Sequence, residues 1–167
     1  MRADTEDSGL VSQLKANAIW LLPLLAIILV LLVQWPQLHL TYIFHQDDTM
    51  PQLRRMESYV TSVRHGSYFP KVFPEEVRNF GYAFDAFYPS LLLLPYVWLR
   101  LAGMGIVSAY YGYQTLILVA TVVTAYVSFL RIRRQPLAGF VFSLVYTTAV
   151  YRALDAFVRG ALGENLA

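Results

Sequence analysis

Acidic and basic side chains that could handle a phosphate or a hydroxyl group follow the first long apolar run. Asp47 and Asp48 are adjacent carboxylates, and Arg55 follows Asp48 by two helical turns, which lets both lie on one helical face. A carboxylate can accept a proton or bind a hard divalent cation, and the planar guanidinium of arginine suits phosphate. A simpler interpretation also fits, in which the acids cap a helix and Arg55 contacts lipid headgroups or pairs with Glu57.

A second polar cluster lies near the end of the sequence, after another apolar stretch. Its members are Arg152, Asp155, Arg159 and Glu164. Asp155 and Arg159 have the i, i+4 spacing of a surface ion pair, which contributes about 0.2–0.5 kcal/mol in a helix. Charges beside apolar runs are costly and usually face a cavity or a partner. A functional role therefore stays open beside the simple ion pair.

The overall composition points to a solvent other than water. The chain has 167 residues, of which 57% are hydrophobic and 14% charged, whereas roughly 25% charged residues is usual in soluble domains. Acidic residues interleave with the basic ones, so we predict no nucleic-acid partner. There are no cysteines, so neither a disulfide nor a thiolate metal site is available. The three histidines lack metal-ligand spacing, and we predict no zinc site.

Three stretches without formal charge, at 18–33, 106–130 and 137–150, predict an all-α integral membrane protein. About twenty apolar residues cross a bilayer, and we expect transmembrane helices at 18–35, 106–130 and 137–151. The acidic start at 1–17 does not fit a cleavable signal peptide. It reads instead as a cytoplasmic tail before a retained anchor.

The polar stretch 36–105 is predicted to be a loop with helices that lie along the membrane. Apolar residues at helical spacing predict an amphipathic helix at about 48–65 that ends at Gly66. The apolar segment 88–103 could cross the membrane or lie flat in its interface. The positive-inside rule favours the flat arrangement, because it leaves the arginines of a 131–136 loop in the cytoplasm.

On this topology the loop at 36–105 and the segment 152–167 share the extracytoplasmic side. The sequence ends within an apparent helix, so we expect 152–167 to begin a further segment of a longer protein.

The polar positions and their surroundings resemble a known family. The matching residues are 45–48, 55–57, 66–70, 80–82, 87–91, Gly103, 146–151, Asp155, Arg159, Gly160, Ala161, Gly163 and Glu164. They resemble the N-terminal portion of polytopic bacterial glycosyltransferases of the GT-C type. The match is with membrane proteins labelled "6-pyruvoyl-tetrahydropterin synthase related", a label that carries no evidence of pterin chemistry.

The resemblance implies a GT-C-like helical bundle in the inner, cytoplasmic membrane. Such enzymes transfer a sugar from a polyprenyl-phosphate donor to an extracytoplasmic glycan or protein acceptor. Asp48 would be the catalytic acid that activates the acceptor or holds a divalent metal ion such as Mg²⁺ or Mn²⁺, with Asp47 as its neighbour. The remaining roles are phosphate binding by Arg55 and Arg159 and lining of the cavity by Glu57, Asp155 and Glu164.

Two other functions stay open on sequence grounds. A non-catalytic membrane protein could transport or scaffold envelope glycans with the same polar cavity. A simple anchor or assembly subunit would be expected to scatter its charges without a shared face.

Overall fold

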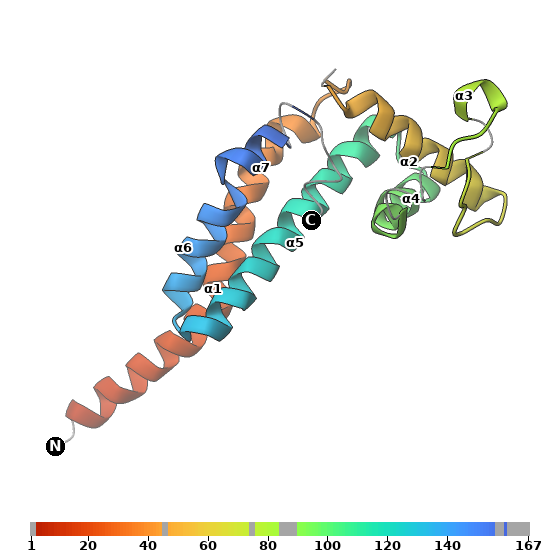
Figure 1. Ribbon diagram of the computed structural model, residues 1–167. Helices are drawn as coiled ribbons and strands as arrows, with labels where there is room; N and C mark the ends of the chain where they lie inside the picture. The colour runs from red at the N-terminus through yellow and green to blue at the C-terminus, as the bar shows by residue number, and fades with distance from the viewer. Residues whose placement is uncertain (1–2, 45–46, 74–75, 84–89, 156–158, 160–167) are drawn as a thin grey trace. The chain divides into compact units, whose positions relative to one another are not determined.

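The computed structural model describes residues 3–44, 47–73, 76–83, 90–155 and 159, and these residues form helices and loops. No strand occurs among them, apart from an isolated antiparallel bridge between Phe73 and Tyr82. The predicted all-α class is confirmed for this part of the chain (Figure 1). The elements are α1 (Ala3–Leu38), α2 (Thr49–Arg64), α3 (Glu76–Asn79), the 3-10 helix η2 (Ser90–Leu93), α4 (Leu94–Leu101), α5 (Ile106–Arg133), α6 (Pro136–Thr147) and α7 (Val150–Leu154).

Two of these helices are long and apolar enough to cross a membrane. The apolar part of α1 covers Asn17–Leu38 and α5 covers Ile106–Arg133, with 22 and 28 residues. At 1.5 Å per residue they measure about 33 Å and about 42 Å, against a hydrocarbon core of about 30 Å. Large apolar side chains such as Trp20 and Val33 are 78% and 65% exposed. A surface of this kind indicates association with a membrane.

The remaining apolar helices are shorter than a membrane span. In the region predicted to cross at 137–151, α6 covers Pro136–Thr147 and α7 begins at Val150. The 12 residues of α6 measure about 18 Å. In the segment predicted to lie flat at 88–103, η2 leads into the 8 residues of α4. Pro95 lies in the first turn of α4, where its missing N–H costs little.

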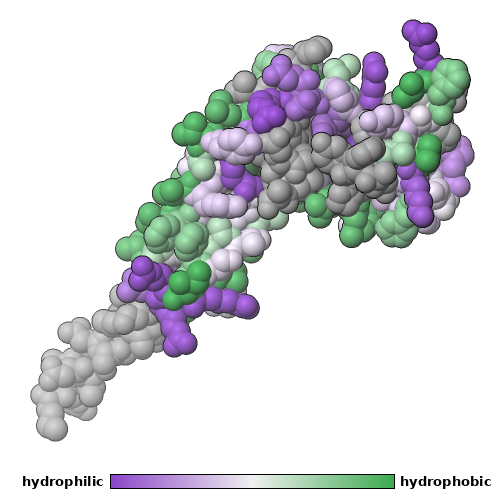
Figure 2. Space-filling model, viewed as in Figure 1, coloured by the Kyte–Doolittle hydropathy of each residue, from purple (hydrophilic) through white to green (hydrophobic). Residues whose placement is uncertain are grey.

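By its contacts the chain divides into two compact units, Met1–Trp35 with Leu118–Ala149, and Pro36–Ile117 with Val150–Ala167. In the first unit α1, α5 and α6 surround a small core, and α1 runs antiparallel to α5. The core consists of Ala26, Val30 and Val122, with Ile27, Leu118, Phe140 and Leu144 against it. Figure 2 shows hydrophobic side chains over the visible face of these helices and hydrophilic ones gathered where α5 leads into α6.

Proline creates an unusual contact inside the first unit. Pro23 has no N–H, so the carbonyl of Ile19 lacks the donor that residue i+4 normally gives it. The hydroxyl of Tyr126 on α5 donates to this carbonyl at 3.0 Å. Gly139 of α6 packs against the same ring, and a Cβ on it would lie 3.2 Å from two ring carbons. One tyrosine therefore fixes the contact of both neighbouring helices.

The second unit has a core of large side chains, many of them tyrosines. The buried residues are Met56, Tyr59, Val60 and Val63 of α2, Phe73, Leu93, Tyr96, Val97, Ala109, Tyr110, Tyr111 and Tyr113. Tyrosine hydroxyls in this core donate to backbone carbonyls: Tyr113 to Leu92 of η2 at 2.7 Å and Tyr111 to Tyr42 at 3.2 Å. These bonds let the polar tips stay satisfied while the rings are buried.

Helix α2 carries most of the polar residues of interest. Its inner face is the apolar stripe predicted from the sequence, and its end is set by Gly66, whose φ of 86° is easily reached by glycine alone among common residues. The amide of Gly66 bonds to Val63 at 2.9 Å and that of Ser67 to Ser62 at 2.9 Å. These bonds satisfy the last carbonyls of the helix in a Schellman motif.

Candidate functional site

The start of α2 is joined to the residues that follow α7. Asp48 is the N-cap residue of α2, but its side chain makes no capping hydrogen bond. Its backbone N–H instead donates to the carbonyl of Arg159 at 2.9 Å. Two residues separated by more than a hundred positions are therefore held side by side, and the carboxylate of Asp48 is not occupied with capping the helix.

Arg159 lies between two carboxylates. Its Nη1 donates to Asp155 Oδ1 at 3.0 Å, and its Nη2 lies 4.0 Å from Asp48 Oδ2. The side chain of Asp155 is 2% exposed, whereas those of Arg159 and Asp48 are 41% and 46% exposed. A buried carboxylate requires a partner, so the Asp155 pair holds the guanidinium in place. The longer contact with Asp48 is open to solvent and contributes little stability.

Arg55 and Gln52 bring further polar groups to the first half of α2. Arg55 is 3% exposed, so its charge lies inside the second unit rather than at the exposed carboxylate of Asp48. Gln52 follows Asp48 by one turn, and its backbone N–H donates to the backbone carbonyl of Asp48 at 3.1 Å. Its side-chain Oε1 is buried and has no hydrogen-bond partner among the described residues.

Glu57 belongs to a different contact, between α2 and α4. Arg100 donates from Nε to Glu57 Oε1 at 2.8 Å and from Nη2 to Oε2 at 3.0 Å, a bidentate pair. The hydroxyl of Tyr96 donates to Oε1 as well, and Arg100 Nη1 donates to the carbonyl of Met104. We call Glu57, Tyr96 and Arg100 the α2–α4 clamp. It fastens the helix that begins at Asp48 to its neighbour.

The clamp shifts the pKa of each of its members. Burial alone would raise the pKa of Glu57, but the hydrogen bonds from Arg100 and Tyr96 outweigh it and hold the pKa below its ordinary value. Burial and the bond to Glu57 raise the pKa of Tyr96 far above its usual range. The hydrogen bond to Glu57 raises the pKa of Arg100. Glu57 is thus held as a carboxylate and is a poor proton donor near neutral pH.

The predicted site residues therefore fall into three places. Asp48, Asp155 and Arg159 come together at the start of α2, while Asp47 is exposed beside them. Arg55 is buried on α2, and Glu57 lies in the α2–α4 clamp. Glu164 lies outside the described residues.

The donor set at Asp48 fits an anion or a hydroxyl group better than a metal ion. Mg²⁺ and Mn²⁺ prefer several oxygen ligands. Here the guanidinium of Arg159 contacts both Asp48 and Asp155. No group of three or more metal-ligating side chains occurs in the described part of the chain. The divalent ion at Asp48 stays a prediction.

Sequence reasoning overlooked Tyr96 and Arg100 as members of a polar network. The signal was present, because a charged residue inside the apolar segment 94–101 needs a partner.

Comparisons with family models, with curated proteins and with solved structures gave no match.

Proposed function

We propose that the chain is the membrane part of a GT-C-like glycosyltransferase, which transfers a sugar from a polyprenyl-phosphate donor to an extracytoplasmic glycan or protein acceptor. The observation that carries the proposal is the contact between the start of α2 and Arg159. It sets an exposed carboxylate beside a guanidinium that a buried carboxylate holds in place. Asp48 lies in the part of the chain between the two helices of spanning length, and Arg159 follows the second of them.

Charge supports a location outside the cytoplasm. Arg131, Arg133 and Arg134 are exposed at the end of α5, and basic residues at the ends of spans favour the cytoplasmic side. If α1 and α5 each cross the inner membrane of a bacterium, the polar segment between them lies on the other side. The contact of Asp48 with Arg159 then requires the chain to return to that side after α5.

The proposed chemistry uses the two exposed members of the site. The carboxylate of Asp48 accepts the proton of the acceptor hydroxyl, and that oxygen forms a bond to the anomeric carbon of the sugar. The bond from this carbon to the phosphate oxygen breaks, and the electron pair leaves with the polyprenyl phosphate. Arg159 stabilises the negative charge of the departing phosphate, because its half-exposed guanidinium lies beside Asp48.

The test is donor turnover by the full chain reconstituted in proteoliposomes. Labelled polyprenyl-phosphate hexoses are supplied with a glycan acceptor, and released polyprenyl phosphate is measured. Asp48→Asn keeps the size of the side chain and removes the proton acceptor, so turnover should fall about 10²-fold to 10⁴-fold. Turnover by Arg159→Gln should fall as well. Arg54 is an exposed arginine on α2, so Arg54→Gln serves as the matched control.

Turnover by Asp48→Asn at the wild-type rate would overturn the assignment of Asp48. Donor binding without turnover in the wild-type chain would instead identify the non-catalytic alternative, a membrane protein that binds or scaffolds envelope glycans.

A further inference from the structure

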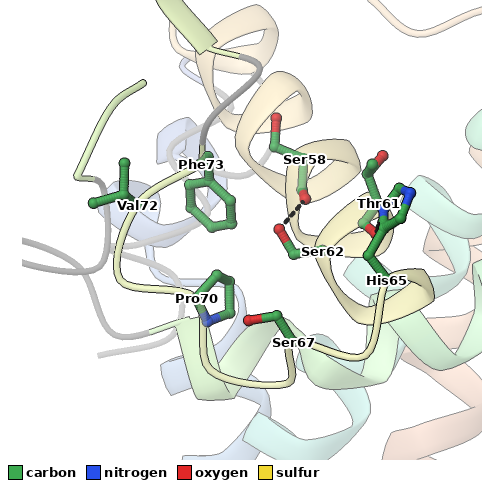
Figure 3. A pocket seen from close by; sticks show the side chains of 8 residues that line it. All are labelled: Ser58, Thr61, Ser62, His65, Ser67, Pro70, Val72 and Phe73. Carbon is green, nitrogen blue, oxygen red and sulfur yellow. Dashed lines mark hydrogen bonds between the residues drawn. The ribbon is translucent and has the colours of Figure 1, made fainter. Parts of the chain in front are cut away.

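A hollow of about 270 Å³ lies at the opposite end of α2 from Asp48 (Figure 3). It is lined by Ser58, Thr61, Ser62, His65, Ser67, Pro70, Val72 and Phe73. From Asp48 to Thr61 the helix rises about 20 Å. The hollow is therefore a separate site on the same helix, and its size is close to the lower end of small-molecule pockets, about 300 Å³.

The two walls of the hollow differ in chemistry. In Figure 3 the rings of Phe73 and Pro70 lie across the space from Ser58 and Ser62 of α2, and Ser67 lies beside Pro70 at the edge of the hollow. One wall is thus apolar and the other carries hydroxyl groups. No formally charged side chain except the titratable His65 is among the described lining residues.

The apolar wall is fixed by contacts behind it. Phe73 exchanges backbone hydrogen bonds with Tyr82, at 2.9 and 3.1 Å. Its ring packs edge-on against Tyr59, with centroids 6.3 Å apart. The hydroxyl of Tyr59 donates to the carbonyl of Tyr68 at 2.8 Å and so ties the loop to α2. The hollow is therefore largely formed before any ligand arrives, which lowers the cost of binding.

The hydroxyl wall keeps hydrogen-bonding capacity. Ser62 donates to the carbonyl of Ser58 at 2.9 Å, which leaves the lone pairs of its oxygen as acceptors. The Nδ1 atom of His65 lies 2.9 Å from the carbonyl of Thr61. A carbonyl can only accept, so Nδ1 carries the proton in this contact. The wall thus offers acceptors to a ligand rich in hydroxyl groups.

We propose that this hollow binds a single neutral sugar ring of the pyranose type. A pyranose has an apolar face of C–H groups and a rim of hydroxyls, which matches the apolar wall and the hydroxyl wall. A phosphate or another compact anion fits poorly, because the lining supplies no arginine or lysine. The inference stands apart from the proposed transfer reaction, since a sugar-binding hollow would serve a transferase and a non-catalytic binder equally.

The test is saturation-transfer NMR on the full chain in a detergent without a sugar headgroup. The probes are the methyl glycosides of glucose, galactose, mannose and N-acetylglucosamine, with inorganic phosphate as the anionic comparator. Ser62→Leu fills the hollow from α2, and Thr41→Leu makes the same kind of change at an exposed loop position. Circular dichroism checks that each variant keeps its helices.

We expect at least one glycoside to bind the wild-type chain with millimolar affinity. Its affinity should be about tenfold or more lower for Ser62→Leu and unchanged for Thr41→Leu. If Ser62→Leu fails to fold, Ser67→Ala is the second variant, and removing one hydroxyl from the wall should weaken binding about threefold to tenfold. Binding of no glycoside, glycoside binding that is equal in the folded variants, or binding of phosphate alone would each overturn the proposal.

Discussion

The two units of the chain bury different kinds of side chain. The fully buried core of the first unit is built around Ala26, Val30 and Val122, and many of its large apolar residues, such as Trp20, are exposed. The core of the second unit is built largely from tyrosines, Met56 and Phe73, and tyrosine hydroxyls there donate to backbone carbonyls. Small residues at helix contacts with large apolar ones outside are typical of helices in lipid, whereas buried large side chains are typical of burial from water. The difference indicates that the first unit is suited to a surrounding of lipid and the second to a surrounding of water.

The largest effect is expected where the second unit buries charge. Glu57→Gln leaves Arg100 without its carboxylate, and the side chains of this pair are 28% and 16% exposed. Loss of one partner of a buried pair costs about 3 kcal/mol at the low end of the measured range. We expect the free energy of unfolding, measured by chemical denaturation, to fall by about that amount, with Arg54→Gln as the control for losing a surface charge on α2.

Acid pH separates this electrostatic effect from a packing defect. Because the pKa of Glu57 is lowered in the folded chain, its contribution is fully present above the ordinary value of 4.5 and is lost as the pH falls through the folded value. The difference between wild type and Glu57→Gln should therefore begin to narrow as the pH falls below 4.5 and close at lower pH. A difference that persists unchanged at lower pH would show that the clamp does not act through the charge of Glu57.

A medium effect is expected where the first unit brings helices close. A side chain on Gly139 must enter space that the ring of Tyr126 occupies. Gly139→Leu should cost about 2 kcal/mol, because overpacking of this kind typically costs 1–3 kcal/mol. Val141→Leu, at a residue 49% exposed on the same helix, should cost little. Equal unfolding midpoints for the two variants in detergent would contradict the close packing of α6 on α5.

Part of this arrangement follows from local spacing in the sequence. The apolar stripe and Gly66 predicted α2, and the i, i+4 spacing predicted the pair of Asp155 and Arg159. Their physical causes act within one or two helical turns, so a single sequence is enough to find them. The sequence could not predict that the side chain of Asp48 makes no capping bond. A capping aspartate and a functional aspartate would occupy the same position before the same helix, so local spacing does not distinguish them.

Contacts between distant residues could not be paired from one sequence. The position of Arg100 in an apolar segment indicates that it needs a carboxylate partner, but the sequence contains several acids. The pairing with Glu57 depends on how α2 packs on α4. Pro23 likewise predicts that the carbonyl of Ile19 lacks its usual helical donor. Which hydroxyl would supply it depends on the register of α1 against α5, and local spacing contains no information on that register.

The smallest effect is expected at this last contact, and it tests the register directly. Tyr126→Phe removes the donor to the Ile19 carbonyl and should cost about 1 kcal/mol, as hydrogen bonds between helices do in membranes. Pro23→Ala restores an N–H that can reach the same carbonyl, so the cost of Tyr126→Phe should largely vanish in that background. Unfolding of the four chains of this double-mutant cycle measures the coupling. Additive effects would mean that the tyrosine does not replace the donor that proline removes, and that its hydroxyl has some other role in the first unit.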